Sequence, residues 1–282
     1  VYRRHTNFSM EAIEQTINGS VAASSSVTTT ISRNGDLVGQ MYLEVNTGTV
    51  NVANYGHALI DYVELEIGGQ RIDKHYGHWM ETWAELTQEN SNGQTAAAVA
   101  NMAVTQGTGP VLYTKFQKMS GAGGVTAANV DMGNLFVPLQ FFFCRNPGLA
   151  LPLIALQYHE VKVKLALSSD YGSGTAGLKI WADYFYLDTD ERRRFAQVSH
   201  EYLIEQVQFE TFSDNTSFDL NFNHPVKELV WTDTYASGDY TGNEIVTGVN
   251  WKLVLNGHDR MAQREYRYFT CAQVWQHHSG FG

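Results

Sequence analysis

Two short segments occur twice in this chain, in the same order and at nearly the same spacing. Ile13-Glu14-Gln15 returns as Ile204-Glu205-Gln206, an offset of 191 residues (204 − 13). The segment 64–69 returns in looser form as 252–257, an offset of 188 residues (257 − 69). A period near 190 is too long for a solenoid repeat and fits a whole β domain with long loops. We therefore expect the same domain twice, with a shortened second copy, since only 78 residues follow Ile204 (282 − 204).

The repeated segment has the pattern of a β-hairpin. Apolar and polar residues alternate along 62–67, and Gly68-Gly69 follows, which suits a type I′ turn. In the second copy 251–255 alternates in the same way before Asn256-Gly257, a strong hairpin dipeptide. Further strands are expected at 37–45, 135–143, 158–167, 178–187, 202–212, 218–222 and 228–232. Strands joined by irregular stretches, without β-α alternation, indicate a sandwich or barrel.

Two short helices and one long loop interrupt this pattern. Trp79, Trp83 and Leu86 form one apolar stripe, which predicts a helix over 76–87. A second helix is expected over 190–198, capped by Thr189, as the connector between the copies. The stretch 89–134 is rich in small and polar residues and is expected to project as a loop.

Composition argues against several classes of function. The net charge of −10 argues against an unassisted nucleic-acid binder, because such proteins gain affinity by neutralising phosphates. Two cysteines, Cys144 and Cys271, make no disulfide framework, and a reducing compartment is the simpler interpretation. The longest apolar run, 149–156, is far short of the ~20 residues that span a bilayer.

The histidines give weak signals for a metal or a catalytic site. His75, His78 and Glu81 lie at helical spacing, but a zinc site usually shows two histidines four residues apart and a distant third ligand. His277-His278 are adjacent and point in different directions in most backbones. His5, His159 and His200 adjoin acidic or hydroxyl residues, but no nucleophile motif accompanies them. We expect no catalytic, metal or cofactor site.

Other chemical motifs have simpler structural explanations. Cys144 is expected to be a buried thiol, although the adjacent Arg145 could lower its pKa. The carboxylates of Asp188, Asp190 and Glu191 suit a helix N-terminus better than a glycosidase pair. Gly121–Gly124 follows no strand and lacks a Lys-Ser/Thr partner, which argues against a phosphate loop. Arg192-Arg193-Arg194, the one strong basic run, is expected to form salt bridges between the halves or across subunits.

Three segments match the N-glycosylation pattern. They begin at Asn7, Asn18 and Asn215. Three matches are close to the number expected by chance, and they matter only if the chain meets a secretory lumen.

Several long motifs resemble those of one protein family. They are the segments 2–8, 67–73, 141–161 and 188–195, the last running on to 200–206. With them the chain closely resembles the major capsid proteins of large icosahedral double-stranded DNA viruses, the group of iridoviruses, phycodnaviruses and mimivirus relatives. The resemblance covers nearly the whole chain.

The resemblance implies an all-β fold, a tandem double jelly roll of two antiparallel eight-stranded sandwiches with short helices in the loops. We expect a first jelly roll at 1–188, a connector helix at 189–199, and the first part of a second roll at 200–282. Members of the family continue beyond this segment, so we expect the chain to be part of a longer subunit.

The resemblance further implies a structural protein of the virion, assembled in the host cytoplasm. Its expected partners are two further copies in a pseudo-hexagonal trimer, neighbouring capsomers, minor capsid proteins and an internal membrane, with no direct contact to nucleic acid. The alternative is a carbohydrate-binding, lectin-like jelly roll, whose aromatic residues would line an open concave sheet. Trp79 and Trp83 share a helix stripe instead.

Overall fold

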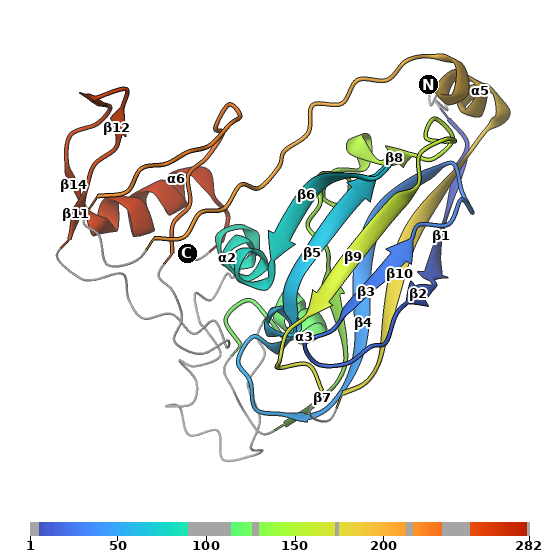
Figure 1. Ribbon diagram of the computed structural model, residues 1–282, viewed down its shortest axis with the longest axis horizontal. Helices are drawn as coiled ribbons and strands as arrows, with labels where there is room; N and C mark the ends of the chain where they lie inside the picture. Colours follow the sequence, from blue (N-terminus) through green and yellow to red (C-terminus); the bar gives the residue numbers. More distant parts are fainter. Residues whose placement is uncertain are drawn as a thin grey trace, which may run out of the picture.

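The computed structural model describes residues 6–89, 114–125, 130–172, 175–212, 217–232 and 249–280. Its largest part is a sandwich of two antiparallel sheets built from residues 8–187 (Figure 1). No helix among the described residues is long and apolar enough to cross a membrane.

One sheet of the sandwich has the order β1-β10-β4-β7, with β8 added beside β4. Its strands are β1 (Phe8–Gln15), β4 (Leu37–Val50), β7 (Val130–Pro138), β8 (Leu151–Pro152) and β10 (Thr175–Leu187). The other sheet has the order β2-β3-β9-β5-β6. Its strands are β2 (Ile17–Asn18), β3 (Ser26–Thr30), β5 (Ile60–Ile67), β6 (Gln70–Tyr76) and β9 (Val161–Leu167). Neighbours in each sheet are mostly distant in sequence, which is the arrangement of a jelly roll.

The core lies between the two sheets and follows the alternation of the strands. Inward side chains are almost fully buried, among them Leu43, Val45, Val63, Leu65, Val163, Leu165, Ile180 and Tyr184. The outward positions of the same strands are partly exposed. This period of two is the signal from which the strands were predicted.

Both predicted hairpin turns are confirmed. Gly68 and Gly69 connect β5 to β6 with φ of 61° and 83°. Asn256 and Gly257 connect β12 (Val254–Leu255) to β13 (His258–Asp259) with φ of 51° and 78°. Positive φ at two successive residues is the requirement of a type I′ turn, which explains these dipeptides.

Short helices close the ends of the sandwich. They are α1 (Tyr55–Ala58), α2 (Gly77–Thr87), α3 (Lys115–Ser120), α4 (Phe142–Arg145) and the 3₁₀ turn η2 (Pro147–Leu149). The predicted helix over 76–87 is confirmed as α2. The strand predicted over 135–143 is wrong at its end, because β7 stops at Pro138 and α4 follows. A short apolar run does not by itself distinguish a strand from a buried helix.

The prediction of a projecting loop over 89–134 is wrong for two stretches. Residues 114–125 contain α3, and β7 begins at Val130; residues 90–113 and 126–129 lie outside the described part. Helix α3 starts with a capping box of Thr114 and Gln117, and Gln117 is buried. This stretch therefore packs on the sandwich.

After β10 the chain forms α5 (Thr189–Gln197), at the position predicted for the connector. Its cap is Asp188, whose side chain accepts the Thr189 N–H, and not Thr189 as the pattern indicated. From Val198 the chain runs extended past β8 and β6 toward α2 (Figure 1). Residues 200–212, which follow α5, are called the arm below.

The strands predicted at 202–212, 218–222 and 228–232 are wrong for all their described residues, which form no ladder. An extended segment becomes a strand only when a partner strand satisfies its backbone groups, and the described chain supplies none here. The later elements are short: β11 (Asn250–Trp251), β12, β13, β14 (Arg264–Glu265), the π-helical turn η3 (Tyr268–Gln273) and α6 (Val274–His277).

Candidate functional site

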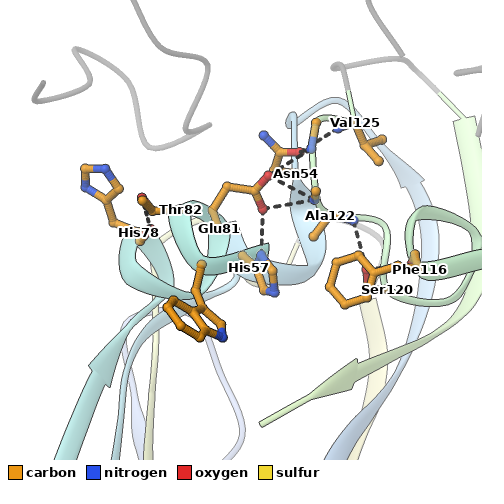
Figure 2. A network of polar contacts seen from close by, with 12 residues as sticks. Asn54, His57, His78, Glu81, Thr82, Phe116, Ser120, Ala122 and Val125 are labelled. Atoms are coloured by element: carbon orange, nitrogen blue, oxygen red, sulfur yellow. Dashed lines mark hydrogen bonds and ion pairs between the residues drawn. The ribbon is translucent and has the colours of Figure 1, made fainter. Parts of the chain in front are cut away.

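Buried polar groups gather where α1, α2 and α3 meet at one end of the sandwich (Figure 2). Glu81, 2% exposed, lies at the centre, and its Oε2 is 2.6 Å from Nδ1 of His57. The same carboxylate accepts the backbone N–H groups of Gly123 and Gly124 at 2.9 Å each. We call Asn54, His57, Glu81, Gly123 and Gly124 the Glu81 network.

Asn54 completes the network from the residue before α1. Its Oδ1 accepts the N–H of Gly124 at 3.0 Å and that of Val125 at 2.6 Å. Asn54 itself has φ of 49°, a left-handed conformation that asparagine tolerates better than most residues. The Glu81 network thus holds residues 123–125, which follow α3, against α1 and α2.

The close approach of α1 and α3 depends on a glycine. A Cβ on Gly56 would lie 1.8 Å from the carbonyl oxygen of Ser120, which no side chain can satisfy without backbone movement. The Gly56 N–H also donates to the carbonyl of Gly121. Glu81 lies on the buried side of α2 with Met80 and Ala84, so the helix directs its carboxylate into this contact.

A histidine paired with a glutamate is also a common catalytic arrangement, and this pair has to be judged as one. Here Glu81 accepts backbone N–H groups, which identifies His57 Nδ1 as a donor. The other ring nitrogen, Nε2, is buried without a hydrogen-bond partner, and the His57 side chain is 0% exposed. Because the His57 ring is closed off from solvent, it cannot act as a base on a substrate. The geometry therefore gives the Glu81 network a structural role, which is to hold the segment after α3 in place.

The structure separates the three residues of the predicted metal-ligand spacing. His75 lies in β6, where Nε2 is 2.8 Å from the Asp73 carboxylate and the ring stacks on Phe141. His78 lies 2.9 Å from the Thr232 hydroxyl, and Glu81 belongs to its network. No group of three or more potential metal ligands exists among the described residues.

The other histidines also lie apart. His200 stacks on Phe195, and His278 contacts Glu228 at 2.5 Å and the Trp83 ring. His159 is exposed beside the Gly68 turn. His5 lies outside the described residues, and His277 is exposed.

The predicted buried thiol is found as expected. Cys144 is 5% exposed, and desolvation raises its pKa to about 12, an effect larger than the opposing one of Arg145. A thiol with this pKa is not ionised at neutral pH and is a poor nucleophile.

The glycine-rich segment 121–124 binds a carboxylate of the protein itself, that of Glu81. The N–H groups of Gly123 and Gly124 point at the Glu81 carboxylate, much as such groups cradle a phosphate elsewhere. Sequence spacing could not reveal this, because Glu81 precedes Gly123 by 42 residues and follows His57 by 24.

The basic run on α5 is divided among different partners. Arg192 forms two contacts of 2.9 Å with Asp36, a residue of the first sandwich that is 6% exposed. Asp36 also accepts the Leu187 N–H, so this pair fixes the start of α5 to the sandwich. Arg193 lies 4.0 Å from Asp190 on the same helix.

The arm contacts the sandwich mainly through side chains. Glu205 pairs with Arg145 at 2.9 Å, and the Val207 N–H donates to the Asp73 carboxylate at 3.0 Å. The Phe209 ring lies 4.9 Å from that of Tyr76. Strand β6 is the edge of its sheet, and the arm covers that edge without extending the ladder.

Two of the three glycosylation patterns lie on described residues. Asn7 and Asn18 are exposed, and Asn7 donates to the Asp188 carboxylate at 3.3 Å. Asn215 lies outside the described residues.

Two family models match the chain almost from end to end. Residues 1–188 match the major capsid protein N-terminus, and residues 191–281 match the large eukaryotic DNA virus major capsid protein. The chain belongs to this family of viral major capsid proteins. The resemblance from its motifs is therefore confirmed.

Individual relatives support the same assignment. The major capsid protein of Pyramimonas orientalis virus is 52% identical, over 99% of this chain and 69% of the relative. That of Phaeocystis pouchetii virus is 43% identical, and the alignment covers 82% of this chain and about half (52%) of the relative.

A solved structure extends the comparison to the fold. A quasi-atomic structure of the PBCV-1 virus capsid matches with a TM-score of 0.71 and 35% identity, over 99% of this chain and 76% of that one. The predicted jelly-roll capsid fold is confirmed, and the chain has a structural role in the capsid of a large DNA virus.

Proposed function

We propose that this chain is the repeated subunit of an icosahedral shell and acts as a homotrimer with a pseudo-hexagonal outline. The observation that supports this most is the match of both halves to capsid families, together with a rigid sandwich. Three copies of two similar units would present six similar edges, and closed threefold symmetry would limit the particle to a trimer. Many weak contacts between trimers would then add up to a stable shell.

We also propose the division of the chain into a first roll at 1–188, a connector at 189–199 and the first part of a second roll at 200–282. The ladder of the sandwich ends at Leu187 in β10, and Asp188 caps α5, which supports a boundary there. Limited proteolysis tests it. The first cut is expected within 198–201, where residues 198, 199 and 201 are exposed, and a first cut within 8–89 would contradict the division.

The proposed role in the shell implies further binding partners. Neighbouring trimers, minor capsid proteins and an internal membrane would contact the trimer in the virion, after assembly in the host cytoplasm. The geometry supports a protein without catalysis, because the acid–base pairs His57–Glu81 and His75–Asp73 are both buried away from solvent. The net charge of −10 supports the absence of direct contact with nucleic acid.

The carbohydrate-binding alternative is less well supported, because Trp79, Trp83 and Trp181 already stack on other rings. A sugar ring needs a free aromatic face, but Trp79 and Trp83 stack on each other with ring centres 5.4 Å apart. Trp181 stacks on Tyr42, and its N–H donates to Glu44 at 2.7 Å. Binding of soluble glycans by the purified protein would revive this alternative.

The mass of the particle in solution tests the trimer. Static light scattering behind size exclusion, on the whole subunit, should give three times the mass of its monomer, with little monomer on dilution to nanomolar concentration. A monodisperse monomer at micromolar concentration would contradict the proposal.

A further inference from the structure

The two outer faces of the sandwich differ sharply in chemistry. On the β3-β9-β5-β6 sheet the outward residues form a ladder of ion pairs, such as Lys164 with Glu66 at 2.5 Å and Lys74 with Glu64 at 3.6 Å. Lys74 also lies 3.7 Å from the centre of the Tyr62 ring. Charges that are paired in this way are typical of a face in contact with water.

The outer face of the β1-β10-β4 sheet is apolar toward the Leu187 end of β10, while Lys179 pairs with Glu14 at its other end. In β10 the residues Ile180, Ala182 and Tyr184 are buried in the core, so the alternate residues point outward. The register pairs Phe8 with Leu187, Met10 with Phe185, and Leu37 with Phe185. Cross-strand partners share a face, which gives a continuous surface that we call the aromatic face. Its residues are Phe8, Met10, Leu37, Trp181, Phe185 and Leu187.

This face is exposed at its edge strand, β1. A Cβ on Gly39 would lie 2.5 Å from the ring of Phe185, so the missing side chain lets that ring lie across β4. Phe8 is 58% exposed and Met10 is 55% exposed, both on the edge strand β1. Exposed apolar side chains on an open sheet edge favour association of chains.

A shallow depression occupies the end of the aromatic face. It has a volume of about 200 Å³ and is lined by Phe8, Leu37, Pro147, Phe185 and Leu187, with Thr6 and Glu191 at its rim. This is several times the ≈ 30 Å³ of a water molecule. The depression can therefore accept one large apolar side chain from another surface, as the central pockets of protein interfaces do.

The described remainder of the chain leaves this face uncovered. The arm and α6 lie on the side of β6 and α2, and β1 and β10 lie at the opposite side of the sandwich (Figure 1). The contacts of residues 202–209 with the sandwich involve Ile72, Asp73, Tyr76, Arg145 and Ala150, and none of the aromatic face.

We infer that the aromatic face is the surface through which one copy of this chain binds the next, an inference that rests on the proposed trimer. Three strands about 4.8 Å apart and eight residues of about 3.3 Å each give a projected area of about 380 Å². A stable interface buries about 800 Å² per partner, so this face supplies close to half of it. A capsid protein meets many copies of itself, which makes a second copy the matching occupant.

Charge supports the same occupant. Asp183 lies on this face and has no hydrogen bond or ion pair among the described residues; its desolvation raises its pKa. Arg194 on α5 is exposed and pairs with no described acidic group. In a threefold ring the contact is between two different surfaces, so a basic group of one copy can meet the acidic group of the next.

Substitution of Met10 by glutamate tests the inference. The side chain is the third of β1 and is 55% exposed, so the change is compatible with folding. A carboxylate placed in the contact should weaken self-association on the order of 100-fold, seen as a shift in the concentration at which scattering mass falls. The matched control is Ser26→Glu, an exposed outward position on β3 of the other sheet, which should leave the mass unchanged.

The outcomes separate the two proposals. A trimer in the wild type and in Ser26→Glu, with dissociation of Met10→Glu, supports the inference. A trimer that Met10→Glu leaves intact overturns it and leaves the trimer standing, and the face would then be open to another shell component. A monomeric wild type overturns the trimer and the inference together. The circular dichroism spectrum of Met10→Glu must match that of the wild type, which shows that the variant folds. If its β signal is lost, the same measurement is made on Phe8→Ser.

Discussion

Removal of the Glu81 side chain should destabilise the protein more than any other single loss of a charge on α2. In Glu81→Ala two donors lose their partner, the buried Nδ1–H of His57 and the partly buried N–H of Gly123, whereas the N–H of Gly124 keeps Asn54. An unsatisfied buried donor costs about 1–3 kcal/mol and the partly buried one less, so the loss is about 3 kcal/mol. Native domains are stable by about 5–15 kcal/mol, which makes this a severe change.

Differential scanning fluorimetry measures the effect as a shift in Tm. At about 2–4 °C per kcal/mol for a chain of this size, Glu81→Ala should lower Tm by roughly 10 °C. Glu85→Ala is the matched control, one turn along the same helix and exposed, and its Tm should be unchanged or slightly higher. Hydrogen exchange should become faster in residues 114–125 of Glu81→Ala. A Tm within 3 °C of the wild type, with unchanged exchange there, would refute the role assigned to the Glu81 network.

Three further predictions address the thiols, the pH dependence and a turn. Iodoacetamide at pH 8 should label the native protein once, at exposed Cys271, and twice after denaturation, because burial raises the pKa of Cys144 to about 12; two fast labels in the native state would contradict this. Desolvation and the nearby Glu81 raise the pKa of Glu85 to about 7, so folding favours its protonated form and stability should fall as pH rises from about 4.5 past 7. The Tm advantage of Glu85→Gln over the wild type should therefore grow from pH 5 to pH 8, modestly because water screens an exposed residue, and a constant difference would contradict the shift. At Gly69, where φ is 83° and the space for a Cβ is open, valine should cost about 1–2 kcal/mol in chemical unfolding and asparagine clearly less; equal costs would exclude backbone strain as the cause.

Local signals in the sequence were sufficient for the turns and for two helices. The hairpins at Gly68-Gly69 and Asn256-Gly257 need only two residues of positive φ, and that requirement is visible in the residue types. Helices α2 and α5 follow from stripes and charges within one segment.

Non-local pairing explains most of what the sequence could not predict. Residues 202–212 alternate like a strand, but the described chain offers them side-chain partners such as Arg145 instead of a ladder. The run from Phe141 to Phe143 is apolar enough for a strand and forms a buried helical turn. Composition alone does not decide between these states.

The Glu81 network could not be predicted from the sequence for the same reason. Asn54, His57 and Glu81 come from separate elements and meet only through the fold, without a spacing that marks them. The sequence did point to Gly121–Gly124, but as a rejected phosphate loop. The aromatic face was missed because Trp181 and Phe185 become neighbours of Phe8 and Met10 only through the pairing of β1 with β10.

The central claim, that this chain is a shell subunit acting as a trimer of two-part chains, is tested most directly by the shape of the purified particle. Two-dimensional class averages from electron microscopy of the unstained protein should show a six-sided outline with threefold symmetry. Averages with a single compact lobe, or with twofold symmetry only, would contradict it.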